Sequence, residues 1–261
     1  MKIAQFIFSL IFLFNFSIFA QEFITPKENF IKTFGSEKQI WVVGYANGTI
    51  DEAFKDLEES FNNGANAIVY ESNDYKKLDL ILAEVRKKYP DKIIGVNFLG
   101  TDDSLMTYKE TFALAKKHQL QIAWTDFSAV DLIREAPETS LHSIESLKPV
   151  KTFYVSGIHM KYSTLLDSKK PIEKSALQAM GWVDGIIITG PKTGVATDHI
   201  KAQRTRRVIG DYPLGAASGV DENNIKQLSP YIDFVLVNTS ISDKNHRIIG
   251  AKVKALRNSF R

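Results

Sequence analysis

The chain has 261 residues, with 33 lysine and arginine residues against 30 aspartate and glutamate residues, and it has no cysteine. A formal net charge of +3 gives no electrostatic case for nucleic acid or an anionic membrane surface as a partner. The absence of cysteine excludes a disulfide framework, a thiolate metal site and a cysteine nucleophile. A hydrophobic content of 44% is typical of globular chains, and this length suits two small domains or one α/β barrel.

Residues 1–20 are predicted to be a secretory signal peptide. Lys2 precedes an uncharged run rich in Phe, Ile and Leu, which ends at Ala20 before Gln21. A basic start, an apolar stretch and a small residue at the cleavage point define such signals. The run of about 18 residues also reaches the lower limit for a membrane-spanning helix, so a retained anchor is the alternative. We therefore expect an exported protein, periplasmic or secreted, with membrane attachment only if this segment is kept.

After a lead-in over residues 21–38, apolar β-prone runs alternate with amphipathic helical runs. Strands are predicted at 40–44, 67–70, 93–97, 121–124, 152–157, 184–189, 213–217 and 233–237. Helices are predicted at 51–63, 78–88, 104–118, 171–180, 198–208, 222–228 and 251–260.

This alternation predicts one α/β domain over residues 39–261, a single (β/α)8 TIM barrel. Successive strands begin 20 to 32 residues apart, which is the length of a βα unit. Strands that are apolar throughout indicate burial on both faces, as in parallel sheets. The main rival is a doubly wound open sheet, but residues 44–48 (GYANG) lack its complete glycine-rich fingerprint. The chain therefore carries no signature of an organic cofactor.

In such barrels the functional residues directly follow the strands. The candidates for proton transfer are Glu71, Asp126, His159 and Lys161. Glu71 and Asp126 have an alternative role as helix caps, and a lone His159 has one as a structural residue.

Asn97 and Asp102 are candidates for orienting a substrate or a divalent cation. The other histidines lack ligand spacing, so no residue is assigned as a metal ligand.

The loops after the last three strands predict an anion site. Loops seven and eight commonly bind phosphate in these barrels, and glycine lets the backbone approach the ligand. The alternative is that Gly219 only makes a turn and that Thr239 and Ser240 cap a helix. The candidate binding residues are Thr189, Gly190, Thr193, Gly194, Ser218, Gly219, Asn238, Thr239 and Ser240.

Three of these segments resemble the BtpA/SgcQ family: 184–194 (DGIIITGPKTG), 215–220 (GAASGV) and 233–240 (DFVLVNTS). Residues 95–99 (GVNFL), 159–161 (HMK) and Glu71 are also similar to motifs of that family. The resemblance implies a (β/α)8 barrel. Members are linked to photosystem I biogenesis in cyanobacteria and to a sugar-related operon in enteric bacteria, which defines no single reaction.

The chain departs from the family pattern at several positions near the strand ends. Asn47 stands where the family has His, Gly100 where it has Arg, Gly157 where it has Asp and Tyr162 where it has His. The Pro-rich loop of the first motif is also missing.

Two functions follow from these observations. The first is an exported enzyme that acts on a small anionic substrate, phosphorylated or sugar-like. The second, favoured by the departures at Asn47 and Gly157, is a non-catalytic barrel that serves in binding or in membrane-protein assembly. Either form could be a homo-oligomer.

Overall fold

The computed structural model describes residues 24–100, 107–126, 130, 146–161 and 167–261. Eight parallel strands form a closed barrel in which each strand pairs with the next and β8 pairs with β1. The strands are β1 (Gln39–Tyr45), β2 (Ala67–Ser72), β3 (Ile94–Phe98), β4 (Ile122–Thr125), β5 (Phe153–Gly157), β6 (Gly185–Thr189), β7 (Leu214–Ala217) and β8 (Phe234–Val237).

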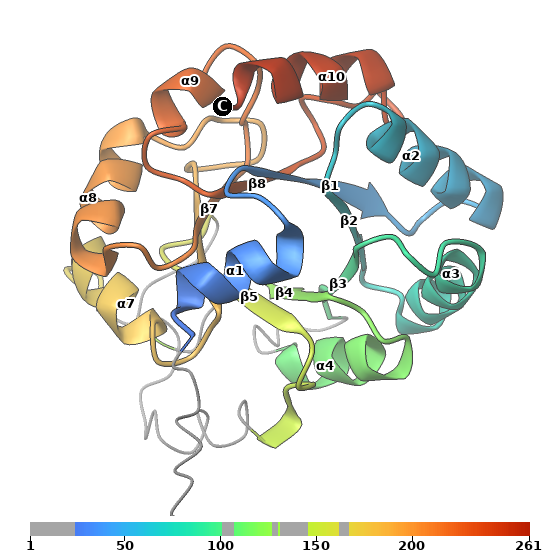
Figure 1. Ribbon diagram of the computed structural model, residues 1–261, viewed down its shortest axis with the longest axis horizontal. Helices are drawn as coiled ribbons and strands as arrows, with labels where there is room; N and C mark the ends of the chain where they lie inside the picture. Colours follow the sequence, from blue (N-terminus) through green and yellow to red (C-terminus); the bar gives the residue numbers. More distant parts are fainter. Residues whose placement is uncertain (1–23, 101–106, 127–129, 131–145, 162–166) are drawn as a thin grey trace, which may run out of the picture.

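Helices surround this barrel (Figure 1). Those described around it are α2 (Ile50–Asn62), α3 (Tyr75–Lys88), α4 (Tyr108–Lys117), α7 (Ile172–Ala179), α8 (His199–Ile209), α9 (Ile225–Leu228) and α10 (Gly250–Ser259). The predicted (β/α)8 barrel is confirmed, and every predicted strand is present within two residues of its expected bounds.

Helix α4 begins at Tyr108, four residues later than predicted, and residues 104–106 lie outside the described ranges. Two further helix starts differ from the prediction for local reasons. Helix α3 begins three residues earlier than expected, because the Asp74 side chain accepts a hydrogen bond from the Lys77 amide and caps the helix. Helix α9 begins three residues later than expected. There Asp221 accepts hydrogen bonds from the amides of Asn223 and Asn224 and holds them in a turn.

Successive residues of each strand point alternately into the barrel and toward the helices. On β1, Trp41 and Val43 belong to the interior cluster, while Ile40 and Val42 pack in the layer between sheet and helices. All four are buried. Burial on both faces explains why the strands read as continuous apolar runs.

The lead-in contains a helix, α1 (Pro26–Phe34), that lies across one end of the barrel (Figure 1). Thr25 and Glu28 form a capping box at its start, and Gly35 ends it in a left-handed conformation. Phe30 is fully buried, with its ring centroid 5.6 Å from that of Phe153 and 5.8 Å from that of Phe234. This end of the barrel is therefore closed by aromatic side chains.

Within the described ranges, no helix is long and apolar enough to cross a membrane. The predicted signal peptide, residues 1–20, lies outside them.

The contacts of α1 predict a large loss of stability when Phe30 is shortened. Phe30→Ala should lower the free energy of unfolding by about 3–5 kcal/mol, because it leaves a cavity among Phe34, Trp41, Phe153 and Phe234. Urea denaturation measures the change. Lys32→Ala, an exposed position on the same helix, is the control and should change it by less than about 0.5 kcal/mol. A loss below about 1 kcal/mol for Phe30→Ala would show that α1 is not part of the core.

Candidate functional site

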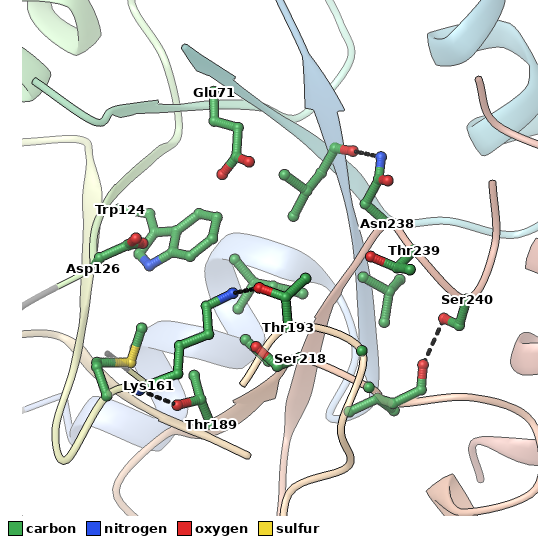
Figure 2. Close-up of a pocket in the computed structure, with 18 of the residues that line it drawn as sticks. Glu71, Trp124, Asp126, Lys161, Thr189, Thr193, Ser218, Asn238, Thr239 and Ser240 are labelled. Atoms are coloured by element: carbon green, nitrogen blue, oxygen red, sulfur yellow. Dashed lines mark hydrogen bonds between the residues drawn. The ribbon is translucent and has the colours of Figure 1, made fainter. Parts of the chain in front are cut away.

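A cavity of about 390 Å³ opens at the carboxyl end of the barrel strands. Figure 2 shows Glu71, Trp124, Asp126 and Lys161 on one side of this cavity and Ser218, Thr239 and Ser240 on the other. The remaining lining residues are Val43, Tyr45, Leu99, Met160, Thr189, Thr193, Gly194, Ala217, Gly219, Val220, Leu236, Val237 and Asn238. The loops of six different strands thus contribute to one site.

The loop after β7 is held in an uncommon backbone conformation. Ser218 and Gly219 both have positive φ, at 67° and 61°. A Cβ atom on Gly219 would lie 2.2 Å from the carbonyl carbon of Val195, and one on Gly190 would lie 2.0 Å from the Val195 oxygen. Both glycines are therefore required for the loop after β6 to pack closely against its neighbours. Strain of this kind at Ser218 is typical of ligand sites.

This side of the cavity offers several hydrogen-bond donors. In the part of the chain that the structure describes, the backbone N–H groups of Gly219, Thr239 and Ser240 have no acceptor within hydrogen-bond distance. The same holds for the hydroxyls of Ser218 and Thr239. The Ser240 hydroxyl instead donates to the Val220 carbonyl at 2.6 Å. Backbone amides and hydroxyls that face a cavity together form a site for an anion.

Glu71, at the end of β2, lies opposite these donors and is only 8% exposed. Burial raises the pKa of its carboxyl from 4.5 to about 8, and the negative charge of Asp126 adds to the rise. Lys161 and a hydrogen bond from Tyr45 act in the opposite direction. Burial and the same two carboxylates raise the pKa of Tyr45 to about 12. Glu71 is therefore mostly protonated at neutral pH.

Asp126 follows β4 and shares the cavity with Glu71. Burial raises the pKa of Asp126, while a hydrogen bond from Asn97 and the charge of Lys161 lower it. The Asn97 amide nitrogen donates to Asp126 at 3.1 Å from a fully buried position. Asn97 therefore orients a carboxylate and does not itself line the cavity.

Lys161 enters the cavity from the loop after β5. Its backbone N–H donates to the Thr189 hydroxyl at 2.9 Å, and its ammonium donates to the Thr193 hydroxyl at 3.0 Å. The Lys201 ammonium, on α8, donates to the carbonyls of His159 and Thr189, each at 2.9 Å. These bonds join the ends of β5 and β6 and hold the turn from which Lys161 projects.

His159 was expected at the reacting centre, but its ring lies against α7 instead. Its φ of 44° turns the ring toward α7, where Nε2 lies 3.0 Å from the Ser175 hydroxyl. It does not line the cavity, so the structural role is the one that the geometry favours.

Other candidates also have structural contacts. Gly190 packs against Val195 and is not among the cavity residues. The Asn238 amide nitrogen donates to the Val43 carbonyl at 2.7 Å, which joins β8 to β1. Glu71 does not cap α3, because Asp74 does. Asp102 lies outside the described residues. The structure therefore brings together Glu71, Asp126, Lys161, Thr189, Thr193, Gly194, Ser218, Gly219, Asn238, Thr239 and Ser240.

Sequence reasoning did not select the apolar residues of the site or Tyr45. Val43, Trp124 and Leu236 face inward because they occupy alternate positions near the ends of their strands. The alternation along each strand could have indicated which residues face inward. The strands are apolar on both faces, however, so the inward-facing residues do not differ in type from the outward-facing ones.

Among the described residues, no group of three or more His, Asp or Glu side chains could hold a metal ion. Glu71 and Asp126 are the two carboxyl groups that line this cavity.

Comparison with known sequences finds distant relatives of this chain. No family model matches the chain. An uncharacterized protein of Methanocaldococcus jannaschii is 23% identical over 216 residues, covering 74% of this chain and 77% of its own length. An uncharacterized protein of Pyrococcus horikoshii is 24% identical over 224 residues, covering 78% of this chain and 83% of its own length.

Several solved structures that share this architecture are distant in sequence. Tryptophan synthase from M. tuberculosis has a TM-score of 0.63 at 12% identity, covering 89% of this chain and 99% of that one. Phosphoribosyl anthranilate isomerase from Thermus thermophilus has a TM-score of 0.57 at 12% identity, covering 85% and 97%.

(S)-3-O-geranylgeranylglyceryl phosphate synthase from Thermoplasma acidophilum, in complex with sn-glycerol-1-phosphate, has a TM-score of 0.58 at 13% identity, covering 90% and 98%. At these identities the likeness shows the barrel fold.

The raised pKa of Glu71 predicts a pH-dependent stability. Between about pH 4.5 and pH 8 the folded protein holds a proton that the unfolded chain releases, so its free energy of unfolding falls as pH rises. At about 1.4 kcal/mol per pKa unit, the loss from this group is at most about 5 kcal/mol. Glu71→Gln should remove this loss.

Urea denaturation at pH 5, 7 and 9 measures the effect. Glu110→Gln, an exposed position on α4, is the control and should follow the wild-type profile. Parallel profiles for Glu71→Gln and wild type would contradict the raised pKa.

Proposed function

We propose that this protein is an enzyme that binds a small phosphorylated substrate at the carboxyl end of its barrel and transfers a proton with Glu71. One observation carries the proposal: a buried carboxyl group with a pKa of about 8 faces a set of unpaired N–H and hydroxyl donors across one cavity. The donors bind the anion and thereby place the rest of the substrate beside the carboxyl groups.

The chemistry follows from the protonation of the two carboxyl groups. Glu71 carries its proton at pH 7 and has a pKa close to the working pH, which suits a general acid that is regenerated in each cycle. Asp126 lies in the same cavity, and its negative charge makes the ionisation of Glu71 less favourable. The Lys161 ammonium acts on both carboxyl groups and would stabilise negative charge that develops on the substrate.

Several distant neighbours are consistent with this reaction class. The solved barrels of similar fold include an isomerase, an aldolase and a synthase in complex with sn-glycerol-1-phosphate. Isomerisation, aldol cleavage and related reactions all require proton transfer at a positioned carbon or oxygen atom. We infer a reaction of this kind for the present chain.

The relationship to the BtpA/SgcQ family is part of the proposal. The family-like segments supply Thr189, Thr193 and Gly194 after β6, Ser218 and Gly219 after β7, and Thr239 and Ser240 after β8. These are the residues on the anion-binding side of the cavity. The proposal therefore treats this protein as a divergent BtpA/SgcQ-like enzyme.

A non-catalytic barrel is the second candidate, and the packing at Gly157 favours it. A Cβ atom on Gly157 would lie 2.1 Å from the Met160 sulfur and 2.4 Å from the Asp126 carbonyl oxygen. The Asp that the family has at this position therefore has no room here. A binding or assembly factor derived from an enzyme could lose such a residue, and this candidate predicts ligand binding without turnover.

The anion site is tested by removing its two cavity-facing hydroxyls. The double variant Ser218→Ala, Thr239→Val should weaken the binding of inorganic phosphate at least about tenfold, because each hydrogen bond to a charged group contributes about 1.5–3 kcal/mol. Isothermal titration calorimetry at constant ionic strength measures the Kd. Ser240→Ala is the matched control, since its hydroxyl is engaged with Val220, and it should stay within about threefold of wild type.

Turnover distinguishes the two candidates. A metabolite screen would identify a ligand, and its conversion would be followed by mass spectrometry in deuterated water. If the protein is an enzyme, Glu71→Gln should keep ligand binding and abolish deuterium incorporation. Ligand binding without turnover would support the non-catalytic candidate. For the anion site, equal phosphate binding by wild type and the double variant Ser218→Ala, Thr239→Val would overturn the proposal.

We also propose that residues 1–20 direct export and are removed. Expression in a bacterial host with N-terminal sequencing of the product should give a chain that begins at Gln21 in the exported fraction. Replacing the apolar residues Ile11 and Leu13 with lysine should stop export and leave Met1 at the terminus. A full-length chain in the membrane fraction would instead support the retained anchor.

A further inference from the structure

The cavity floor differs in chemistry from its rim. Val43, Trp124, Met160, Ala217 and Leu236 line the bottom of the cavity, and all belong to the interior aromatic and aliphatic cluster of the barrel. Each is nearly buried. The anion-binding donors and the carboxyl groups lie above this floor. A ligand that fills the cavity therefore touches polar groups around the sides and apolar groups on the floor.

Trp124 provides the largest apolar surface of this floor. Its side chain projects from β4 between Glu71 and Lys161 toward the middle of the cavity (Figure 2). The residue is only 6% exposed, and its indole N–H is buried with no hydrogen-bond acceptor among the described residues. At the mouth of the cavity, Leu99 is 40% exposed. Trp124 and Leu99 thus give the cavity lining apolar surface both on its buried side and near solvent.

The cavity is larger than an inorganic anion requires. Its volume of about 390 Å³ lies in the range of about 300–1,000 Å³ that is typical of small-molecule sites. A phosphate on the loops after β7 and β8 would leave the space above Trp124 for the remainder of the substrate. A polyhydroxylated body packed on the floor would place the hydroxyls of that face against Trp124, Met160 and Leu236 and lose hydrogen bonds to water there. A flat apolar body would bury surface without that loss.

We propose that the substrate is a phosphate monoester whose body is a planar, apolar ring that packs on Trp124. This inference rests on the proposed function and names its substrate class. Of the phosphorylated and sugar-like substrates expected from the sequence, it selects the first and excludes the second. Trp124 is then the residue that determines specificity, and Leu99 covers the ring from the mouth of the cavity.

The experiment compares three probes on the purified protein by calorimetry: inorganic phosphate, glycerol phosphate and phenyl phosphate. Phenyl phosphate should bind at least about tenfold more tightly than glycerol phosphate, because only the phenyl ring buries apolar surface on the floor. Glycerol phosphate should bind about as tightly as inorganic phosphate. Equal or tighter binding of glycerol phosphate than of phenyl phosphate would overturn the proposal.

Variants assign this preference to Trp124. Trp124→Ala should reduce the preference for phenyl phosphate to less than about threefold while leaving the Kd for inorganic phosphate within about twofold of wild type. Trp124→Phe keeps a ring and removes the N–H, and it should keep most of the preference. Thermal melting shows whether Trp124→Ala folds. If it does not, Trp124→Phe serves as the test. Trp182→Phe, outside the cavity, is the matched control and should behave as wild type.

A neutral probe separates this inference from the proposed function. Phenol should bind to the cavity and quench tryptophan fluorescence in wild type and in Trp182→Phe, and the quenching should disappear in Trp124→Phe. If no phosphate compound binds but phenol does, the phosphorylated substrate fails and the apolar floor stands. If phosphate binds but phenol does not, and phenyl phosphate shows no preference, the ring-binding floor fails and the anion site stands.

Discussion

The hydrogen-bonded pairing of β8 with β1 is the constraint on which the rest of the structure depends. It joins Gln39–Val42 to Phe234–Val237 and closes the sheet, so that the carboxyl ends of all eight strands surround one opening. Asn238, which lines the cavity, strengthens this closure by donating to the Val43 carbonyl. At the opposite end, α1 covers the barrel with Phe30 and Phe34. Among the described residues, the cavity therefore opens at the carboxyl end of the strands, and the other end of the barrel is covered.

Closure also explains the electrostatics of the site. Glu71 and Asp126 come from strands β2 and β4, which are separated by β3, yet the curvature of the barrel directs both side chains into one cavity. Burial away from water and the nearby charge of Asp126 both make the ionised form of Glu71 less favourable than the protonated form. The same enclosure places an apolar floor beneath the carboxyl groups. The two carboxyl groups, the hydrogen-bond donors after β7 and β8, and the apolar floor meet in one cavity because of this single geometry.

The sequence predicted the barrel and its strand bounds well, because the apolar runs and helix signals are local and recur at a nearly constant interval. It also brought the correct loops into consideration, since strand ends meet at one edge of a parallel sheet. It was less accurate for individual residues. His159 follows β5 as expected, but it has a positive φ and its ring contacts Ser175. Asn97 is fully buried and donates a hydrogen bond to Asp126. The lead-in carried capping signals at Thr25 and Glu28 without revealing where Phe30 packs.

The amino-acid sequence by itself determined the number of βα units, the absence of cysteine chemistry and the set of polar residues available at the strand ends. These properties depend on local spacing and composition, which need no knowledge of distant contacts. Only the tertiary structure decided which of those residues share a cavity, that burial raises the pKa of Glu71 to about 8, and that Trp124 forms part of an apolar floor. A pKa and a binding surface depend on burial and on neighbours far apart in the chain, and these exist only once the barrel has closed.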